Sequence, residues 1–127
     1  MSAFEDLADI SPYAVWNGVR ARVAGGERVT FSVLELDPDT AVPEHAHDNE
    51  QIGVLASGSL RFRIGDEEQE LRPGATWCIP PNVPHAVQAG PEGASVVEVF
   101  APARDDWQAL ERLEPSPPLW PVRPGRL

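Results

Sequence analysis

The sequence contains no lysine, a single cysteine (Cys78) and no long hydrophobic run. One cysteine excludes an intrachain disulfide, which is typical of proteins from a reducing compartment, and we expect Cys78 to be a buried, inert thiol. No stretch approaches the ~20 apolar residues that a membrane-spanning helix requires. Residues 1–6 are acidic, whereas a secretory signal starts with basic residues. The sequence therefore predicts a soluble, cytoplasmic protein that does not bind membranes.

Positive charge is also scarce: the chain has 10 arginines and 20 acidic residues, so the net charge is −10. Binding to a phosphate backbone depends on clustered Lys and Arg, and the arginines here are scattered. Nucleic acid is therefore not an expected partner. The length of 127 residues and the hydrophobic content of 42% are typical of one globular domain.

Short alternating segments separated by turn residues dominate the chain, and no long helical period lies between them. We expect strands at residues 19–23, 29–36, 51–55, 59–64, 69–71, 76–79, 85–88 and 95–100. This pattern predicts an all-β fold, either an antiparallel barrel or a double sheet. Arg20 and Arg22 share one strand face, and one of them is a candidate for the mouth of a cavity.

The end of the chain has a different pattern. Trp107, Leu110 and Leu113 recur every three residues after Asp105, which predicts a short helix. Residues 115–121 are too rich in proline for a helix or a central strand. We therefore expect one domain over residues 1–114 and a proline-rich C-terminal arm over residues 115–127. The arm is either extended, with Trp120 anchoring it on the barrel or on a partner subunit, or disordered.

All three histidines lie in two short segments of the sequence. His45 and His47 are two residues apart, so on an extended strand both point to the same side. Gln51 on the next strand and His85, which follows a proline-rich turn, are candidates to complete the same set of ligands. Each histidine alone has a structural alternative, but one site accounts for all three. We therefore predict a metal centre formed by His45, His47, Gln51 and His85.

These two segments resemble the paired motifs of the cupin superfamily over roughly residues 16–107. The matching positions are His45, His47, Gln51 and Gly58 in the first motif, and Pro73, Gly74, Pro80, Asn82 and His85 in the second. The resemblance implies a cupin double-stranded β-helix, which is a jelly-roll-like barrel, and a bound metal. Asp39 and Asn82 stand where glycine is usual or frequent, and both residue types accept left-handed backbone geometry.

Gln51 stands where many cupins have glutamate. Glu50 is adjacent, but it faces the opposite side of the strand. Three imidazoles and an amide leave the double charge of the ion uncompensated, so the site should attract a carboxylate or enolate oxygen. The ligand types suit one divalent transition ion, namely Ni, Zn, Fe, Mn or Co.

The same ligand set is similar to that of KdgF-type cupins, which convert 4,5-unsaturated uronate monosaccharides into a linear keto acid. That family carries an acidic residue, a phenylalanine and an arginine implicated in activity, and Glu98, Phe100 and Arg104 stand at those positions. Glu98 replaces the usual aspartate. Glu98 and Phe100 share a strand face, and a carboxylate beside a bound enol can move a proton between oxygen and carbon.

Other interpretations remain open at this point. Glu98 can be a solvent-facing strand residue, Phe100 a core residue, and Arg104 a partner of Asp105 or Glu111. A different metal-dependent cupin enzyme, such as an Fe(II) dioxygenase, an isomerase or a cyclase, is the alternative activity, and a non-catalytic binding or sensor module for a small acid is another. We expect a small anionic, sugar-derived molecule as the partner, and a homodimer.

Overall fold

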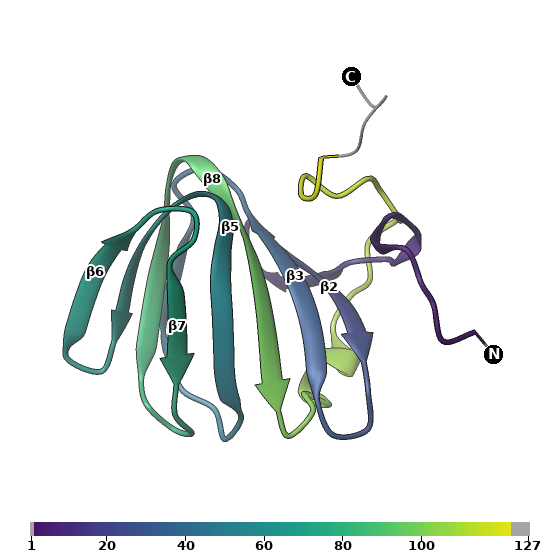
Figure 1. Ribbon diagram of the computed structural model, residues 1–127, viewed down its shortest axis with the longest axis horizontal. Helices are drawn as coiled ribbons and strands as arrows, with labels where there is room; N and C mark the ends of the chain where they lie inside the picture. The colour runs from purple at the N-terminus through teal and green to yellow at the C-terminus, as the bar shows by residue number, and fades with distance from the viewer. Residues whose placement is uncertain (1, 123–127) are drawn as a thin grey trace.

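The structure is a computed structural model that describes residues 2–122, in which eight strands form one antiparallel sheet folded on itself (Figure 1). Two one-turn 3-10 helices, η1 and η2, flank the strands. The elements in chain order are η1 (Leu7–Asp9), β1 (Tyr13–Trp16), β2 (Val19–Gly25), β3 (Thr30–Leu36), β4 (Ala41–His45), β5 (Glu50–Ile64), β6 (Glu67–Leu71), β7 (Thr76–Ile79), β8 (His85–Ala101) and η2 (Asp106–Ala109).

β5 and β8 are long and pair with each other along almost their whole length. Each was expected as two short strands, but the predicted turn at residues 57–58 is a bulged bend within a continuous strand. Gly58 makes this bend possible: its φ is +83°, and a Cβ there would lie 2.0 Å from the carbonyl oxygen of Gly93. The bend folds the sheet back on itself.

The other strands attach to the two halves of this bent ribbon. The strand order is β1-β2-β3-β8-β5-β6, while β4 pairs with the first half of β8 and β7 with the first half of β5. The apolar faces of both halves enclose the core, which includes Val19, Leu34, Leu55, Phe62 and Val96. The predicted all-β fold is confirmed, although the sequence did not indicate β1 and β4.

The C-terminal helix is shorter than the sequence predicts. Only η2 forms, and the chain is already extended at Leu110. Glu111 accepts a hydrogen bond from the backbone N–H of Ala14, and Leu113 donates one to the carbonyl oxygen of Pro12. Pairing with the chain at β1 thus replaces the hydrogen bonds that would have continued a helix.

Two predictions on individual side chains are wrong. Cys78 is exposed, because the inward positions of β7 belong to its neighbours Trp77 and Ile79. Neither Arg20 nor Arg22 lines the cavity. Arg20 pairs with Glu35 and Asp37, whereas Arg22 faces the C-terminal arm and donates to the carbonyl and hydroxyl oxygens of Ser116 at 3.0 and 2.9 Å. Ser116 therefore holds the described part of the arm on the outside of the sheet. Residues 123–127 of the predicted arm lie outside the described residues.

Among the described residues, no helix combines the length and the hydropathy needed to cross a membrane.

Candidate metal centre and the adjoining cavity

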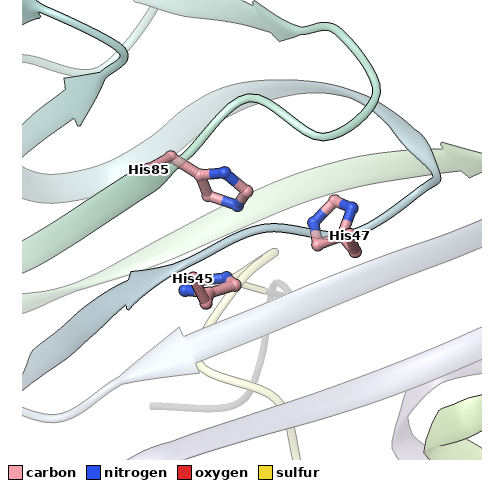
Figure 2. Close-up of side chains that lie close together, drawn as sticks. All are labelled: His45, His47 and His85. Carbon is pink, nitrogen blue, oxygen red and sulfur yellow. The ribbon is translucent and has the colours of Figure 1, made fainter.

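Three histidines from separate segments converge at one end of the barrel (Figure 2). His45 ends β4, His47 lies in the connection to β5, and His85 begins β8 directly opposite His45 in the sheet. Their candidate ligand nitrogens all lie within 4.8 Å of one another. The backbone N–H of Asn82 donates to the carbonyl oxygen of His47 at 2.8 Å, which ties the two motif segments together.

Backbone carbonyls fix the ring orientation of all three histidines. The Nδ1 atoms of His45, His47 and His85 lie 2.8, 3.0 and 2.9 Å from the carbonyl oxygens of Pro43, Asn49 and Val83, respectively. A carbonyl oxygen only accepts hydrogen bonds, so each Nδ1 carries the hydrogen. Each neutral ring then presents an Nε2 lone pair, as in metal sites whose ligand orientation is set by surrounding groups.

The environment of His47 and His85 favours the neutral form, which can bind a metal. Burial lowers the pKa of His85 to about 4 and also lowers the pKa of His47. The Nε2 atom of His85 is buried and has no hydrogen-bond partner among the described residues. A buried acceptor without a partner is costly unless something else occupies that position.

Gln51 completes this set of ligand atoms. Its Oε1 lies 2.9 Å from Nε2 of His47, while its amide nitrogen donates to the carboxylate of Glu98. Two lone-pair acceptors therefore face each other, which is unfavourable without a cation between them. Adjacent ligands of an ion with bonds of ~2.1 Å are separated by about 3 Å, so the residues present fit one divalent transition ion.

Glu98 lies on β8 next to these ligands and is buried, with 5% of its surface exposed. Its Oε2 accepts hydrogen bonds from the Gln51 amide and from the indole nitrogen of Trp77, the latter at 2.9 Å. Burial raises the pKa of Glu98, and these two hydrogen bonds partly oppose the shift. A carboxyl group whose pKa is raised in this way is suited to take up and release a proton.

A glycine allows Trp77 to reach Glu98. Gly53 on β5 lies between them in the sheet, opposite Trp77 on β7 and opposite Glu98 on β8. A Cβ at Gly53 would lie 2.6 Å from the indole ring. The missing side chain therefore lets the indole cross β5 and donate to the carboxylate.

Arg104 lies beyond the end of β8, where its backbone N–H donates to the hydroxyl of Thr30 at 2.8 Å. Its guanidinium lies 5.0 Å from the ring centre of Phe100 and 4.6 Å from that of Trp107. Two of its nitrogens donate to Asp106, at 3.2 and 2.7 Å, and this pairing lowers the pKa of Asp106. The guanidinium is thus held in one orientation by a carboxylate, the kind of partner that such a planar donor pairs with well.

These groups share one cavity of about 240 Å³ inside the barrel. Its polar lining comes from six side chains, and apolar side chains form the rest of the wall. The polar ones are His45, Gln51, His85, Glu98, Arg104 and Asp106. A mostly apolar cavity with a few convergent polar groups is typical of a small-molecule site.

Comparison with family models supports this architecture. Residues 32–100, which carry both histidine segments and Glu98, match the model described as "Cupin domain". The chain belongs to the cupin family.

This cupin is similar to two curated proteins. One is the H2HPP isomerase of Bacillus subtilis, 36% identical over 75 residues that cover 57% of this chain and 31% of that protein. The other is the pectin degradation protein KdgF of Dickeya dadantii (strain 3937), 33% identical over 64 residues that cover 50% of this chain and 58% of the relative. The matched segments span less than two thirds of either relative.

Among solved structures, KdgF from Halomonas sp. is similar, with a TM-score of 0.76 and 22% identity. The match covers 84% of this chain and 98% of that structure, and it shows a shared fold. The cupin barrel predicted from the motifs is therefore confirmed.

The predicted residues all lie in or beside the cavity. The alternative of a solvent-facing Glu98 is wrong, and Arg104 pairs with Asp106 instead of Asp105 or Glu111. Phe100 is buried and also lines the cavity, so it belongs to both the core and the pocket wall. Trp77 was not among the predicted site residues, yet its indole nitrogen donates to Glu98 at 2.9 Å. Strand alternation places Trp77 and Ile79 on the same face, but it does not indicate a hydrogen bond to Glu98.

Proposed function

We propose that this cupin is a metal-dependent enzyme that moves a proton within a small anionic substrate. The KdgF-like reaction, ring opening and ketonisation of a 4,5-unsaturated uronate, is the specific form of this proposal. The observation that carries it is the cavity shared by His45, His85, Gln51 and the buried carboxylate of Glu98, with the ligand nitrogen of His47 within 4.8 Å of those of the other two histidines. The similarity to a protein named for pectin degradation supports a sugar-derived acid as substrate.

The reaction needs no oxidant and no second substrate. When the hemiacetal of an unsaturated uronate opens, the bond between the anomeric carbon and the ring oxygen breaks, and the anomeric hydroxyl loses its proton to become an aldehyde. The ring oxygen gains a proton and becomes an enol hydroxyl on the carbon beside the carboxylate. The enol then loses its O–H proton and its C–O bond becomes C=O, while the next carbon gains a proton and the C=C bond becomes a single bond. A divalent ion bound by His45, His47, Gln51 and His85 would supply stabilisation of negative charge on a substrate oxygen.

Glu98 is the group proposed to move the proton. Its Oε2 is held by Gln51 and Trp77, and among the described residues no hydrogen bond reaches Oε1. One oxygen is thus fixed in position while the other remains available to the substrate. Arg104 is proposed to contact the substrate carboxylate, with Asp106 holding the guanidinium in place.

The test compares wild-type protein with Glu98→Gln, both loaded with a divalent transition ion. We expect the wild type to accelerate the loss of enol-ether absorbance of an unsaturated uronate, and the variant to lose about 10²–10⁴-fold in kcat. Glu92→Gln makes the same chemical change at an exposed position of β8 and should leave kcat unchanged.

No acceleration by the metal-loaded wild type would refute the proposed reaction. Equal rates for wild type and Glu98→Gln would refute the role of Glu98. Stabilisation of the protein by the uronate without turnover would favour the binding-module alternative.

A further inference from the structure

The cavity wall changes character with depth, as the strand register shows. The first row holds His45 and His85 on one side, and Gln51 beside Phe100 on the other. Two residues deeper, Glu98 lies on one side, while Val87 pairs with Phe62 on the other. Two residues deeper again, all the lining side chains are apolar: Val96 beside Leu34, and Leu60 across the cavity.

The depth of these rows suits a molecule with a polar end and an apolar tail. Inward positions on a strand repeat every two residues, or about 6.8 Å, so three rows span about 13 Å. Polar groups are present in the first and second rows and at the rim formed by Arg104 and Asp106. The third row offers only alkyl groups, and Phe62 in the second row adds an aromatic surface.

The polar groups that do line the cavity are mostly committed. The Gln51 amide and the Trp77 indole are used on Glu98, and two of the Arg104 nitrogens are used on Asp106. The backbone groups of the third row belong to the sheet ladders of β3, β5 and β8. Hydroxyl groups at that depth would lose their water and gain no partner, whereas an alkyl or aryl tail would gain by burial.

From this arrangement we propose that the cavity selects the enol of a 2-oxo acid with an alkyl or aryl tail, and catalyses its ketonisation. The inference rests on the proton transfer proposed above, because an opened unsaturated uronate and such an acid share the same reacting end. In both, the carboxylate is bonded to the carbon that carries the enol oxygen, and the next carbon is the one that gains the proton. The enol O–H proton is lost as the C–O bond becomes C=O, and the adjacent carbon is protonated as the C=C bond becomes a single bond, so the reaction is again balanced.

Binding of stable acids to the Zn²⁺-loaded protein tests the tail preference without turnover. Isothermal titration calorimetry with 3-phenylpropanoate, propanoate and glucuronate compares an aryl tail, no tail and a polyhydroxylated tail. We expect 3-phenylpropanoate to bind at least tenfold more tightly than either of the other acids. Equal affinities for 3-phenylpropanoate and propanoate, or tighter binding of glucuronate, would overturn the proposal.

A variant pair locates the effect in the third row. Val96→Phe fills the inner end of the cavity, whereas Val97→Phe makes the same change at a neighbouring position that does not line it. We expect only Val96→Phe to lose the preference for 3-phenylpropanoate, with propanoate binding unchanged. Loss of the preference in both variants would contradict this location, and the wild-type titrations decide the proposal even if Val96→Phe does not fold.

Turnover separates this inference from the proposed function. Decay of the ultraviolet absorbance of the phenylpyruvate enol, relative to its spontaneous rate, should be accelerated more than that of an unsaturated uronate. Tail-dependent binding without turnover of either compound would refute the proposed proton transfer and leave the tail preference intact. Turnover of the uronate with no gain from an aryl tail would refute the tail preference alone.

Discussion

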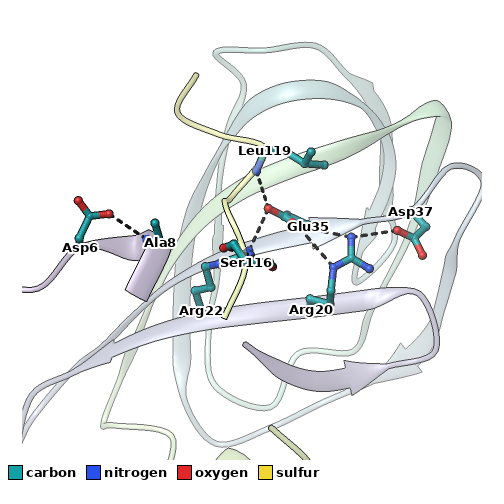
Figure 3. A network of polar contacts seen from close by, with 8 residues as sticks. All are labelled: Asp6, Ala8, Arg20, Arg22, Glu35, Asp37, Ser116 and Leu119. Carbon is teal, nitrogen blue, oxygen red and sulfur yellow. Dashed lines mark hydrogen bonds and ion pairs between the residues drawn. The ribbon is translucent and has the colours of Figure 1, made fainter. Parts of the chain in front are cut away.

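Glu35 and Glu98 lie on the paired strands β3 and β8, and both are almost fully buried, at 3% and 5% exposure. Glu35 faces the outside of the sheet beneath the C-terminal arm, where Arg22 and Arg20 approach it at 3.0 and 3.4 Å (Figure 3). The backbone N–H of Leu119 also donates to it at 2.7 Å. Glu98 faces the cavity and receives hydrogen bonds only from uncharged groups.

This difference fits a structural role for Glu35 and the proton-transfer role proposed for Glu98. A guanidinium in direct contact favours the ionised form of a carboxylate and would hinder it from taking up a proton. Arg22 and Arg20 therefore suit Glu35, whose contacts join β2, β3 and the arm. Glu98 has no such partner, and a carboxyl that must exchange a proton during a reaction needs this freedom.

Removing the cation beside Glu35 should have the largest effect on stability. Arg22→Met leaves a buried carboxylate without its main partner, and we expect the free energy of unfolding to fall by about 3–5 kcal/mol. Urea denaturation monitored by tryptophan fluorescence measures this change. Arg20→Met removes the partly exposed arginine and should cost about 1 kcal/mol or less. Equal losses of stability in the two variants would show that Arg22 does not stabilise the buried Glu35 more than Arg20 does.

Two buried groups of the cavity, His85 and Glu98, should affect stability in opposite directions as the pH falls in the metal-free protein. His85, whose folded pKa is lowered to about 4, binds fewer protons than in the unfolded chain, so its contribution to stability is lost as the pH falls from about 6.5 toward 4. Glu98, whose pKa is raised, binds more protons in the folded state, so its contribution increases as the pH falls. We therefore expect the two groups to oppose each other.

Removing the carboxyl group reveals this compensation. Between pH 7 and pH 4.5, with a chelator present, Glu98→Gln should lose more stability than the wild type. Urea midpoints at several pH values measure the difference. Glu92→Gln, at an exposed site, should follow the wild-type curve. A steeper loss in the wild type than in Glu98→Gln would reverse the assigned sign.

The residues that sequence reasoning located best are those whose spacing or chemistry is local. The spacing of His45 and His47 required only neighbouring residues. The left-handed positions Asp39 and Asn82 followed from the resemblance to the cupin motifs together with the local chemistry of Asp and Asn, and both have positive φ, at 61° and 64°. The short strands were also recognised from local alternation. Their fusion into β5 and β8 depends on the close approach of Gly58 to Gly93, which only the folded sheet brings about.

Contacts across the sheet were also harder to predict, because only the folded sheet brings their residues together. Trp77 reaches Glu98 across Gly53, and these three residues come from three strands. Arg22 reaches Glu35 and Ser116, which are 13 and 94 positions away in the sequence. Sequence patterns indicate which way such side chains face, but their partners depend on strand register and on the path of the arm.

The smallest expected effect concerns the hydrogen bond from Trp77 to Glu98. Trp77→Phe keeps an aromatic ring against Phe62, now 5.1 Å between ring centres, and removes the indole donor. Because this change also alters packing, a double-mutant cycle with Glu98→Gln is needed to isolate the interaction. We expect a coupling energy of about 1 kcal/mol from urea denaturation.

Trp107→Phe is the matched control, since Trp107 lines the same cavity and contacts Phe100 and Arg104. Its effect should be additive with that of Glu98→Gln. Additivity in the Trp77 cycle would mean that the indole only fills space, and the orientation of Glu98 would then depend on Gln51. Coupling found only in the Trp77 cycle would instead show that the indole hydrogen bond helps to position the carboxylate of Glu98. The absence of a side chain at Gly53 makes that hydrogen bond possible.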